Sequence, residues 1–208
     1  LAVMMGRGAM SNSIGELDNA PFLLVAGSNT TETHPIIALH MKRALRKGAR
    51  MVVVDPRKIE WVSSAHRWLP IRVGTDIALF NAMAPVIITE RLYKEAYGRQ
   101  RTAGFEERQR HLERYTPTYA AEITGVPAED IIATAREYAT AERAAIVYTL
   151  GITEHSCGVH NVQALANLGL LCGNLGIESA GVNPLRGQNN VQGAGDAGAT
   201  PDNLPGYQ

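Results

Sequence analysis

A polar run near the end of the chain, residues 186–195, combines residue types that could surround a polar ligand. It reads RGQNNVQGAG, with one cation, four side-chain amides and three glycines. Arg186 supplies a single positive charge, and the side-chain amides can both donate and accept hydrogen bonds. Because glycine disfavours helices and strands, we predict a loop shaped around a polar ligand, with a plain surface turn as the alternative.

Polar residues also follow three apolar runs that are typical of buried strands. GSNTTETH begins at Gly27 after FLLVA, Asp55 follows MVVV, and LGITEHSCGVH, residues 150–160, follows AAIVYT. The hydroxyls and amides of residues 27–34 suit a phosphate or a sugar, although the cluster lacks the G-x-G-x-x-G fingerprint of nicotinamide sites. A carboxylate at the position of Asp55 suits the two hydroxyls of a ribose.

Asp76 lies in VGTDIAL, at the start of a helical pattern. A carboxylate there could pair with the N1–H and the 2-amino group of guanine. For Asp76, as for Asp55 and residues 27–34, the alternative is an ordinary capping role without a ligand.

Residues 150–160 contain three side chains of soft types that can bind a metal ion. His155, Cys157 and His160 are zinc-ligand types, but a tetrahedral site needs a fourth ligand and orienting partners that the sequence does not provide. We therefore expect a ligand-facing turn, and no metal ligand in this chain. The other cysteine, Cys172, forms no C-x-x-C pair with Cys157, which argues against a disulfide framework and favours a reducing, cytoplasmic location.

The elements that must position these loops follow from hydrophobic periodicity. We expect strands, helices and turns to alternate, which predicts parallel strands joined by right-handed crossovers. The fold class is therefore α/β, a doubly wound and mainly parallel sheet flanked by helices. The expected strands cover residues 22–27, 50–54, 66–74 and 144–151, and the expected helices cover 36–47, 75–92, 126–139 and 161–173, with short helices in 93–115.

Composition narrows the classes of partner. The 208 residues include 20 basic and 20 acidic side chains, so the net charge is zero and no long-range field favours nucleic acid or acidic lipid. No apolar run approaches the roughly 20 residues needed to cross a bilayer. We expect no nucleic-acid partner and no membrane insertion. The chain begins at Leu1, and we expect it to be a piece of a longer one.

Four long segments together resemble one family. They are GSNTTETHPIIALHMKRALRKGARMVVVDPRKIE, VGTDIALFNAMAPVIITE, RAAIVYTLGITEHSCGVHNVQALANLGLLCGNLG and GVNPLRGQNNVQGAGDAG. In this order they resemble the catalytic subunit of molybdenum or tungsten formate dehydrogenases, which are molybdopterin oxidoreductases of the dimethyl-sulfoxide-reductase superfamily. The early motifs are shared with nitrate reductases, whereas NPLRGQNNVQGA is more specific to formate dehydrogenases.

The resemblance implies a metal held by two molybdopterin guanine dinucleotides, the bis-MGD cofactor. The Cys or selenocysteine ligand and the iron-sulfur cluster would lie upstream of Leu1. Residues 1–188 look like the family's Rossmann-like third domain, and residues 189–208 like the start of the next cofactor-binding domain. The implied partners are formate, the remainder of the catalytic subunit and electron-transfer subunits.

The resemblance also implies individual roles. Arg186 would hold the substrate carboxylate. The residues expected to bind the cofactor are Gly27, Ser28, Asn29, Thr31, Glu32, Thr33, Asp55, Arg57, Gly74 and Asp76 at its nucleotide end, and Leu150, Gly151, Glu154, His155, Gly187 and Gln188 near the pterin. Leu150 and Glu154 depart from the usual Met and Gln, and Gly195 and Ala197 from Cys and Met. The alternatives are a nitrate-reductase-like enzyme, or a nucleotide-binding or assembly module without chemistry of its own.

Overall fold

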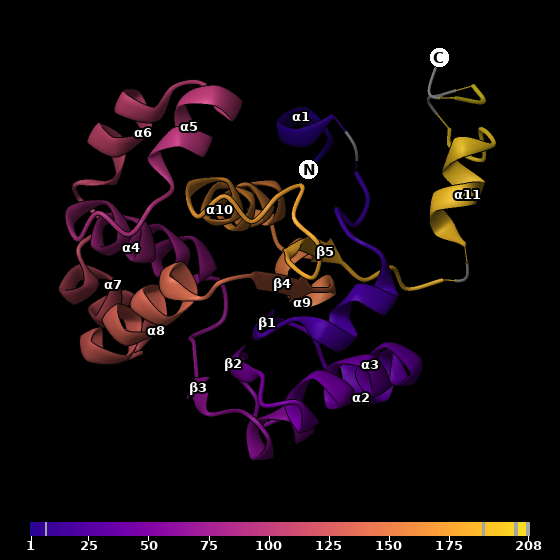
Figure 1. The fold of residues 1–208 in the computed structure, drawn as a ribbon, viewed down its shortest axis with the longest axis horizontal. Coiled ribbons are helices and arrows are strands. Elements are labelled where there is room, and N and C mark those ends of the chain that lie inside the picture. The colour runs from indigo at the N-terminus through magenta and orange to yellow at the C-terminus, as the bar shows by residue number, and fades with distance from the viewer. Residues whose placement is uncertain (7, 189, 202–203, 207–208) are drawn as a thin grey trace.

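A single parallel sheet organises the residues that the computed structural model describes, which are 1–6, 8–188, 190–201 and 204–206. The strand order is β3-β2-β1-β4-β5, and every pairing is parallel (Figure 1). The α/β doubly wound prediction is therefore confirmed. The strands are β1 (Phe22–Ala26), β2 (Arg50–Val54), β3 (Arg67–Leu69), β4 (Ala144–Tyr148) and β5 (Gly181–Pro184).

Both faces of the sheet are covered by helices, which is why its central strands are continuous apolar runs rather than alternating ones. In β1, Phe22 and Leu24 belong to one core cluster, whereas Leu23 and Val25 belong to the other. The first face carries α4 (Asp76–Thr89), α7 (Pro117–Thr124), α8 (Ala128–Thr140) and α10 (Gly158–Leu171), and the second face carries η1 (Ile14–Asn19), α3 (Pro35–Arg46) and η2 (Glu60–Ser63).

Short helices fill the connections. They are α1 (Ala2–Met5), α2 (Thr30–Thr33), α5 (Glu95–Arg101), α6 (Phe105–Leu112), α9 (Leu150–Thr153) and α11 (Val191–Asp196). In Figure 1, α11 stands apart from the layered body, beyond the segment that follows β5. The proposed boundary between residues 188 and 189 remains a prediction.

The helix α4 lies at the centre of the first face. It packs against α7, α8 and α10, and its side chains are buried on nearly all sides, as expected for an apolar helix inside a core. Thr75 is its N-cap residue and Asp76 is its first residue. Pro85 lies within the helix, where it cannot donate a backbone hydrogen bond.

The predicted elements differ from the structure mainly at the sheet edges. Of the expected strand 66–74, only the three residues of β3 pair with β2. The edge strand β5 was not predicted, because its sequence GVNP contains glycine and proline, which are poor strand formers. Its place is fixed by pairing with β4 and by Ser11, whose Oγ accepts the N–H of Val182 and whose N–H donates to the Val182 carbonyl.

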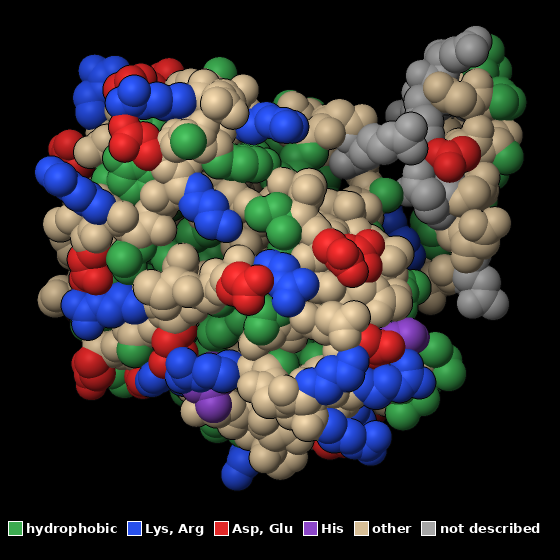
Figure 2. All heavy atoms as spheres, viewed as in Figure 1, with side chains coloured by type: hydrophobic (Ala, Val, Ile, Leu, Met, Phe, Trp, Pro, Cys, Tyr) green, Lys and Arg blue, Asp and Glu red, His purple; other side chains and the backbone are tan. Residues whose placement is uncertain are grey.

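The surface carries mixed charge. Figure 2 shows Lys and Arg side chains interspersed with Asp and Glu over the visible face, so this face has no large region of a single sign. Within the described part of the chain, no helix combines the length and the apolar character required to span a membrane.

The central strand supports a first prediction. Leu24 is fully buried in β1, whereas Leu39 on α3 is 47% exposed. We expect Leu24→Ala to lower the free energy of unfolding by about 2 to 5 kcal/mol, because it leaves a cavity in the core. The matched control, Leu39→Ala, should change it by less than about 1 kcal/mol. Urea unfolding of the three chains measures the difference, and equal losses would contradict this core assignment.

Candidate functional site

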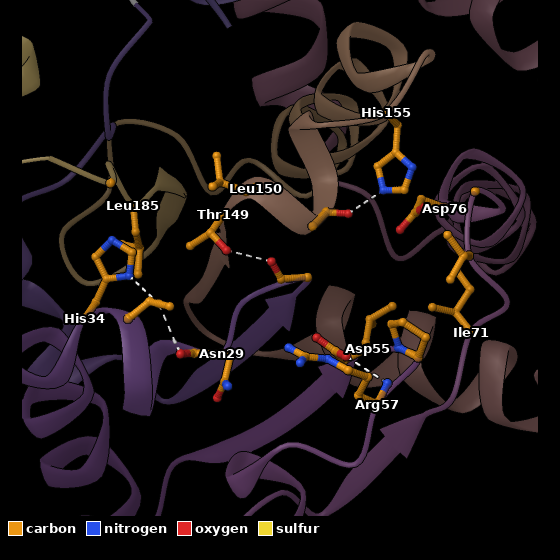
Figure 3. Close-up of a pocket in the computed structure, with 18 residues that line it drawn as sticks. Asn29, His34, Asp55, Arg57, Ile71, Asp76, Thr149, Leu150, His155 and Leu185 are labelled. Atoms are coloured by element: carbon orange, nitrogen blue, oxygen red, sulfur yellow. Dashed lines mark hydrogen bonds between the residues drawn. The ribbon is translucent and has the colours of Figure 1, made fainter.

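A cavity of about 510 Å³ opens at the carboxyl edge of the sheet, where the chain leaves β1, β2 and β4 and where α4 begins. This is the switch point of the strand order, since the chain leaves β1 and β4 toward opposite faces. The cavity is lined by eleven of the predicted residues, namely Gly27, Asn29, Thr33, Asp55, Arg57, Gly74, Asp76, Leu150, Gly151, His155 and Gly187. Figure 3 shows the labelled members around the opening.

Two glycine backbones, Gly27 and Gly151, touch at the floor of this cavity. A Cβ on Gly27 would lie 2.6 Å from the carbonyl carbon of Gly151 and 2.8 Å from its Cα. The carbonyl of Gly27 accepts hydrogen bonds from Thr149 Oγ1 at 2.6 Å and from the Gly151 N–H at 3.2 Å. Gly27 also has a φ of 53°, which favours glycine. The contact between the two loops therefore requires glycine even without a ligand.

The carboxylate of Asp55 is held at the end of β2 and is 5% exposed. Its Oδ1 accepts the N–H of Arg57 at 2.8 Å, and its backbone carbonyl accepts Trp68 Nε1–H at 2.9 Å. No described residue donates a hydrogen bond to its other oxygen, Oδ2, in the structure. Asp55 thus caps its own turn through Oδ1.

Asp76, at the start of α4, is 6% exposed and lines the same cavity. Burial raises the pKa of its carboxyl, and the charge of Asp55 raises it further; its own backbone N–H and His155 act in the opposite direction. Thr75 occupies the N-cap position without a side-chain capping bond, and Asp76 lies in the first turn of α4, where a carboxylate also complements the helix N-terminus. A carboxylate buried at a cavity wall is a feature of binding sites.

Of the predicted pterin-side residues, Leu150 and Gly151 lie in α9, Glu154 is its C-cap residue and His155 follows it. His155 Nε2 lies 2.8 Å from the carbonyl oxygen of Gly151, so Nε2 carries the proton. Leu150 is 54% exposed and lines the opening, whereas the exposed Glu154 does not line it.

The residue types that suggested zinc do not converge. Cys157 Sγ contacts Asn161 Oδ1, and His160 Nδ1 contacts Gln163 Oε1, while His155 bonds to the backbone carbonyl of Gly151 in α9. Among the described residues, no three His, Cys, Asp or Glu side chains are grouped so that they could hold a metal ion. Cys157 and the buried Cys172 are free thiols, and burial raises the pKa of Cys172 to about 12.

The loop after β1 divides into residues that face the cavity and residues that stabilise the loop. Asn29 and Thr33 line the cavity. Ser28 is buried and its hydroxyl shares a 2.7 Å hydrogen bond with Thr30 Oγ1, so it stabilises the turn instead. Thr31 Oγ1 donates to Asn29 Oδ1 at 3.3 Å. Neither Thr31 nor the exposed Glu32 lines the cavity.

Arg186 follows Leu185, a buried residue directly after β5. Its side chain is exposed, does not line the cavity, and donates a hydrogen bond to the carbonyl of Gly8. Its own carbonyl lies 2.5 Å from His34 Nε2. Gly187 lines the cavity, whereas Gln188 is exposed outside it.

Sequence reasoning missed part of the lining: His34, Val54, Pro56, Ile71, Val73, Thr149 and Leu185. His34 belongs to the quoted polar cluster, and Thr149 and Leu185 adjoin predicted residues, so their positions carried a signal. No sequence pattern indicated that Ile71 and Val73 would line a cavity, because apolar residues beside a short strand usually lie in the core.

The comparisons with known proteins agree with this architecture. A family model of molybdopterin oxidoreductases matches residues 4–207, and the chain therefore belongs to the molybdopterin oxidoreductase family. The solved structure of acetylene hydratase from Pelobacter acetylenicus is similar, with a TM-score of 0.71 and 28% identity over 77% of this chain and 24% of that one.

Curated relatives are more similar in sequence. Formate dehydrogenase H of Escherichia coli is 50% identical over 204 residues, and the alpha subunit of a formate dehydrogenase from Methanocaldococcus jannaschii is 48% identical over 208 residues. These matches cover 98% and 100% of this chain, but only 28% and 31% of the relatives. The chain thus spans less than a third of their length.

The glycine contact generates the second prediction. In Gly27→Ala the new Cβ meets backbone atoms that cannot rotate away, so we expect the free energy of unfolding to fall by about 1 to 3 kcal/mol from overpacking, in addition to the strain of a positive φ. The control is Gly48→Ala, which has a φ of 94° but no atom within 4 Å of the added Cβ. Chemical denaturation compares the two; a loss no larger in Gly27→Ala would refute the contact.

Proposed function

We propose that this chain is the guanine-dinucleotide-binding part of a formate dehydrogenase catalytic subunit. The observation that carries the proposal is the pair of buried carboxylates, Asp55 and Asp76, at one cavity beside the touching glycines of the sheet's switch point. Burying two carboxylates near each other is unfavourable for folding, so their presence is best explained by a ligand with several hydrogen-bond donors.

The residues fit the guanosine end of molybdopterin guanine dinucleotide. The cavity volume of about 510 Å³ lies within the range of about 300 to 1,000 Å³ that is usual for small-molecule sites. Asp76 would accept the N1–H and 2-amino group of guanine, and Oδ2 of Asp55 would accept a ribose hydroxyl. Ile71 and Val73 would provide an apolar wall for the base.

The pterin end would lie toward Leu150, Gly151, His155 and Gly187, with Gln188 following. The molybdenum or tungsten of the bound cofactor would supply the two-electron redox chemistry for formate oxidation. This chain's own contribution would be to bind and orient: Arg186 would hold the formate carboxylate by a charge-assisted pair of hydrogen bonds. The iron-sulfur cluster, the protein ligand of the metal and the electron-transfer partners would belong to other parts of the enzyme, which we expect to be cytoplasmic.

A nitrate-reductase-like enzyme is the second candidate, and an assembly module is the third. Acetylene hydratase, which is named for another substrate, has a similar fold, so the fold alone does not determine the substrate. The formate assignment rests on the sequence NPLRGQNN around Arg186 and on the high identity to formate dehydrogenases.

Nucleotide binding gives the third prediction. Asp76→Asn should weaken guanosine monophosphate binding by at least about tenfold, because a hydrogen bond to a charged group contributes about 1.5 to 3 kcal/mol. Adenosine monophosphate, which lacks the two donors, is the matched control ligand, and Glu129→Gln on the exposed start of α8 is the control variant. Calorimetric titration measures the affinities, and unchanged binding in Asp76→Asn would contradict the guanine assignment.

Asp76→Asn, which should weaken nucleotide binding, should at the same time increase the free energy of unfolding at neutral pH. Burial raises the Asp76 pKa in the folded chain, so the folded form retains the proton to higher pH than the unfolded form. The resulting stabilisation is complete below the unfolded pKa of about 3.9 and is lost as pH rises through the folded pKa. Asp76→Asn should therefore be the more stable chain at neutral pH, with a difference that disappears toward low pH.

The fourth prediction concerns Arg186 in the complete cofactor-loaded subunit. Loss of a close charge-assisted contact in Arg186→Ala should lower kcat/KM for formate by about two to three orders of magnitude, equivalent to about 3 to 4 kcal/mol. Arg186→Lys should retain more activity, because it keeps the charge but loses the planar fork. Metal and pterin contents, measured on the same preparations, should stay near normal. A parallel loss of cofactor would instead make Arg186 a cofactor-binding residue.

A further inference from the structure

The imidazole of His34 joins two segments that are 152 residues apart in sequence. Its Nε2 lies 2.5 Å from the carbonyl oxygen of Arg186. A carbonyl oxygen can only accept, so Nε2 carries the proton and donates. Figure 3 shows His34 beside Leu185 on one side of the cavity, opposite Ile71 and Asp76. The contact therefore connects the loop after β1 with the segment after β5.

The backbone of His34 is held from both sides. Its N–H donates to the Thr30 carbonyl at 2.9 Å, and its carbonyl accepts the N–H of Ala38 at 2.9 Å. Pro35 follows it and restricts its backbone further. Its Nδ1 lies 2.8 Å from Thr33 Oγ1, whose oxygen is also 3.1 Å from the Asn29 carbonyl. The imidazole is thus a fixed donor rather than a free surface side chain.

This donor acts on the peptide unit between Arg186 and Gly187. In a trans peptide the C=O and the following N–H point in opposite directions. With the carbonyl held by His34, the N–H of Gly187 must point away from the imidazole. On the other side of Arg186, the N–H of Leu185 donates to the Tyr148 carbonyl at 2.9 Å. The short segment around the arginine is consequently fixed at two adjacent points.

We propose that His34 is a positioning residue for formate binding. By holding the carbonyl of Arg186, it sets the direction from which the guanidinium approaches the substrate carboxylate and orients the Gly187 N–H, without itself touching formate. The orientation of the Arg186 side chain would then also depend on the loop that carries Asn29 and Thr33, because this loop positions His34 and lines the nucleotide cavity. This inference rests on the proposed function of Arg186.

The fifth prediction tests His34 in the complete cofactor-loaded subunit. His34→Ala should lower kcat/KM for formate by about tenfold, mainly through a higher KM. An Arg186 side chain that is no longer correctly oriented should bind formate less tightly both in the substrate complex and in the transition state. His34→Gln, which restores an N–H donor, should recover most of the loss. Metal and pterin contents should stay unchanged. His40→Ala is the matched control, since this histidine on α3 contacts Asp18 instead.

Two further measurements separate positioning from a general structural role. Hydrogen–deuterium exchange of the Leu185 amide should become faster in His34→Ala, but not in His34→Gln or His40→Ala. In the Arg186→Ala background, adding His34→Ala should cause no further loss of kcat/KM, because both changes remove the same interaction.

Several outcomes would overturn the inference. They are unchanged kcat/KM and exchange in His34→Ala, independent losses in the double variant, no rescue by glutamine, or a loss of cofactor that accounts for the loss of activity. A parent enzyme that oxidises no formate would instead overturn the proposed function. In that case the exchange experiment still tests whether His34 fixes the segment around Arg186.

Discussion

The backbone contact between Gly27 and Gly151 is the constraint on which the geometry of the cavity depends. The chain runs from β1 to α3 on one face of the sheet and from β4 to α10 on the other, so the two connections diverge and leave a crevice. The glycine contact, with the hydrogen bond from Thr149 to the Gly27 carbonyl, closes the base of that crevice. A side chain at either position would separate the loops and the groups they carry.

The sheet brings the other polar groups to this base. In the parallel register, Ala26 pairs with both Val54 and Tyr148, so β1, β2 and β4 end at the same level. Asp55 therefore emerges beside Gly27, and the N-terminus of α4 adds Asp76 across the opening. Two apolar cores, one on each face, hold the strands in this register. The cores thus act on the site by fixing where the strand ends lie.

The cavity combines groups that are unfavourable for folding with groups that stabilise it. Asp76 lies buried with a raised pKa, and Asp55 contributes to that rise. In contrast, Ser28 turns its hydroxyl inward to Thr30, and His155 donates to the backbone of Gly151, so both stabilise the loops. A polar residue in one of these loops can therefore have either role, and its type alone does not distinguish them.

The sequence by itself determined the central strands, the helix ended by Gly48, the parallel α/β class and most of the cavity lining, because apolar runs and polar strand ends are local patterns. The family resemblance was likewise carried by the sequence. Only the tertiary structure decided that β5 exists, that Gly27 meets Gly151, and that His34 reaches Arg186. The physical reason is that local sequence specifies which groups can donate, accept or approach closely. Strand order and register decide which distant groups actually meet.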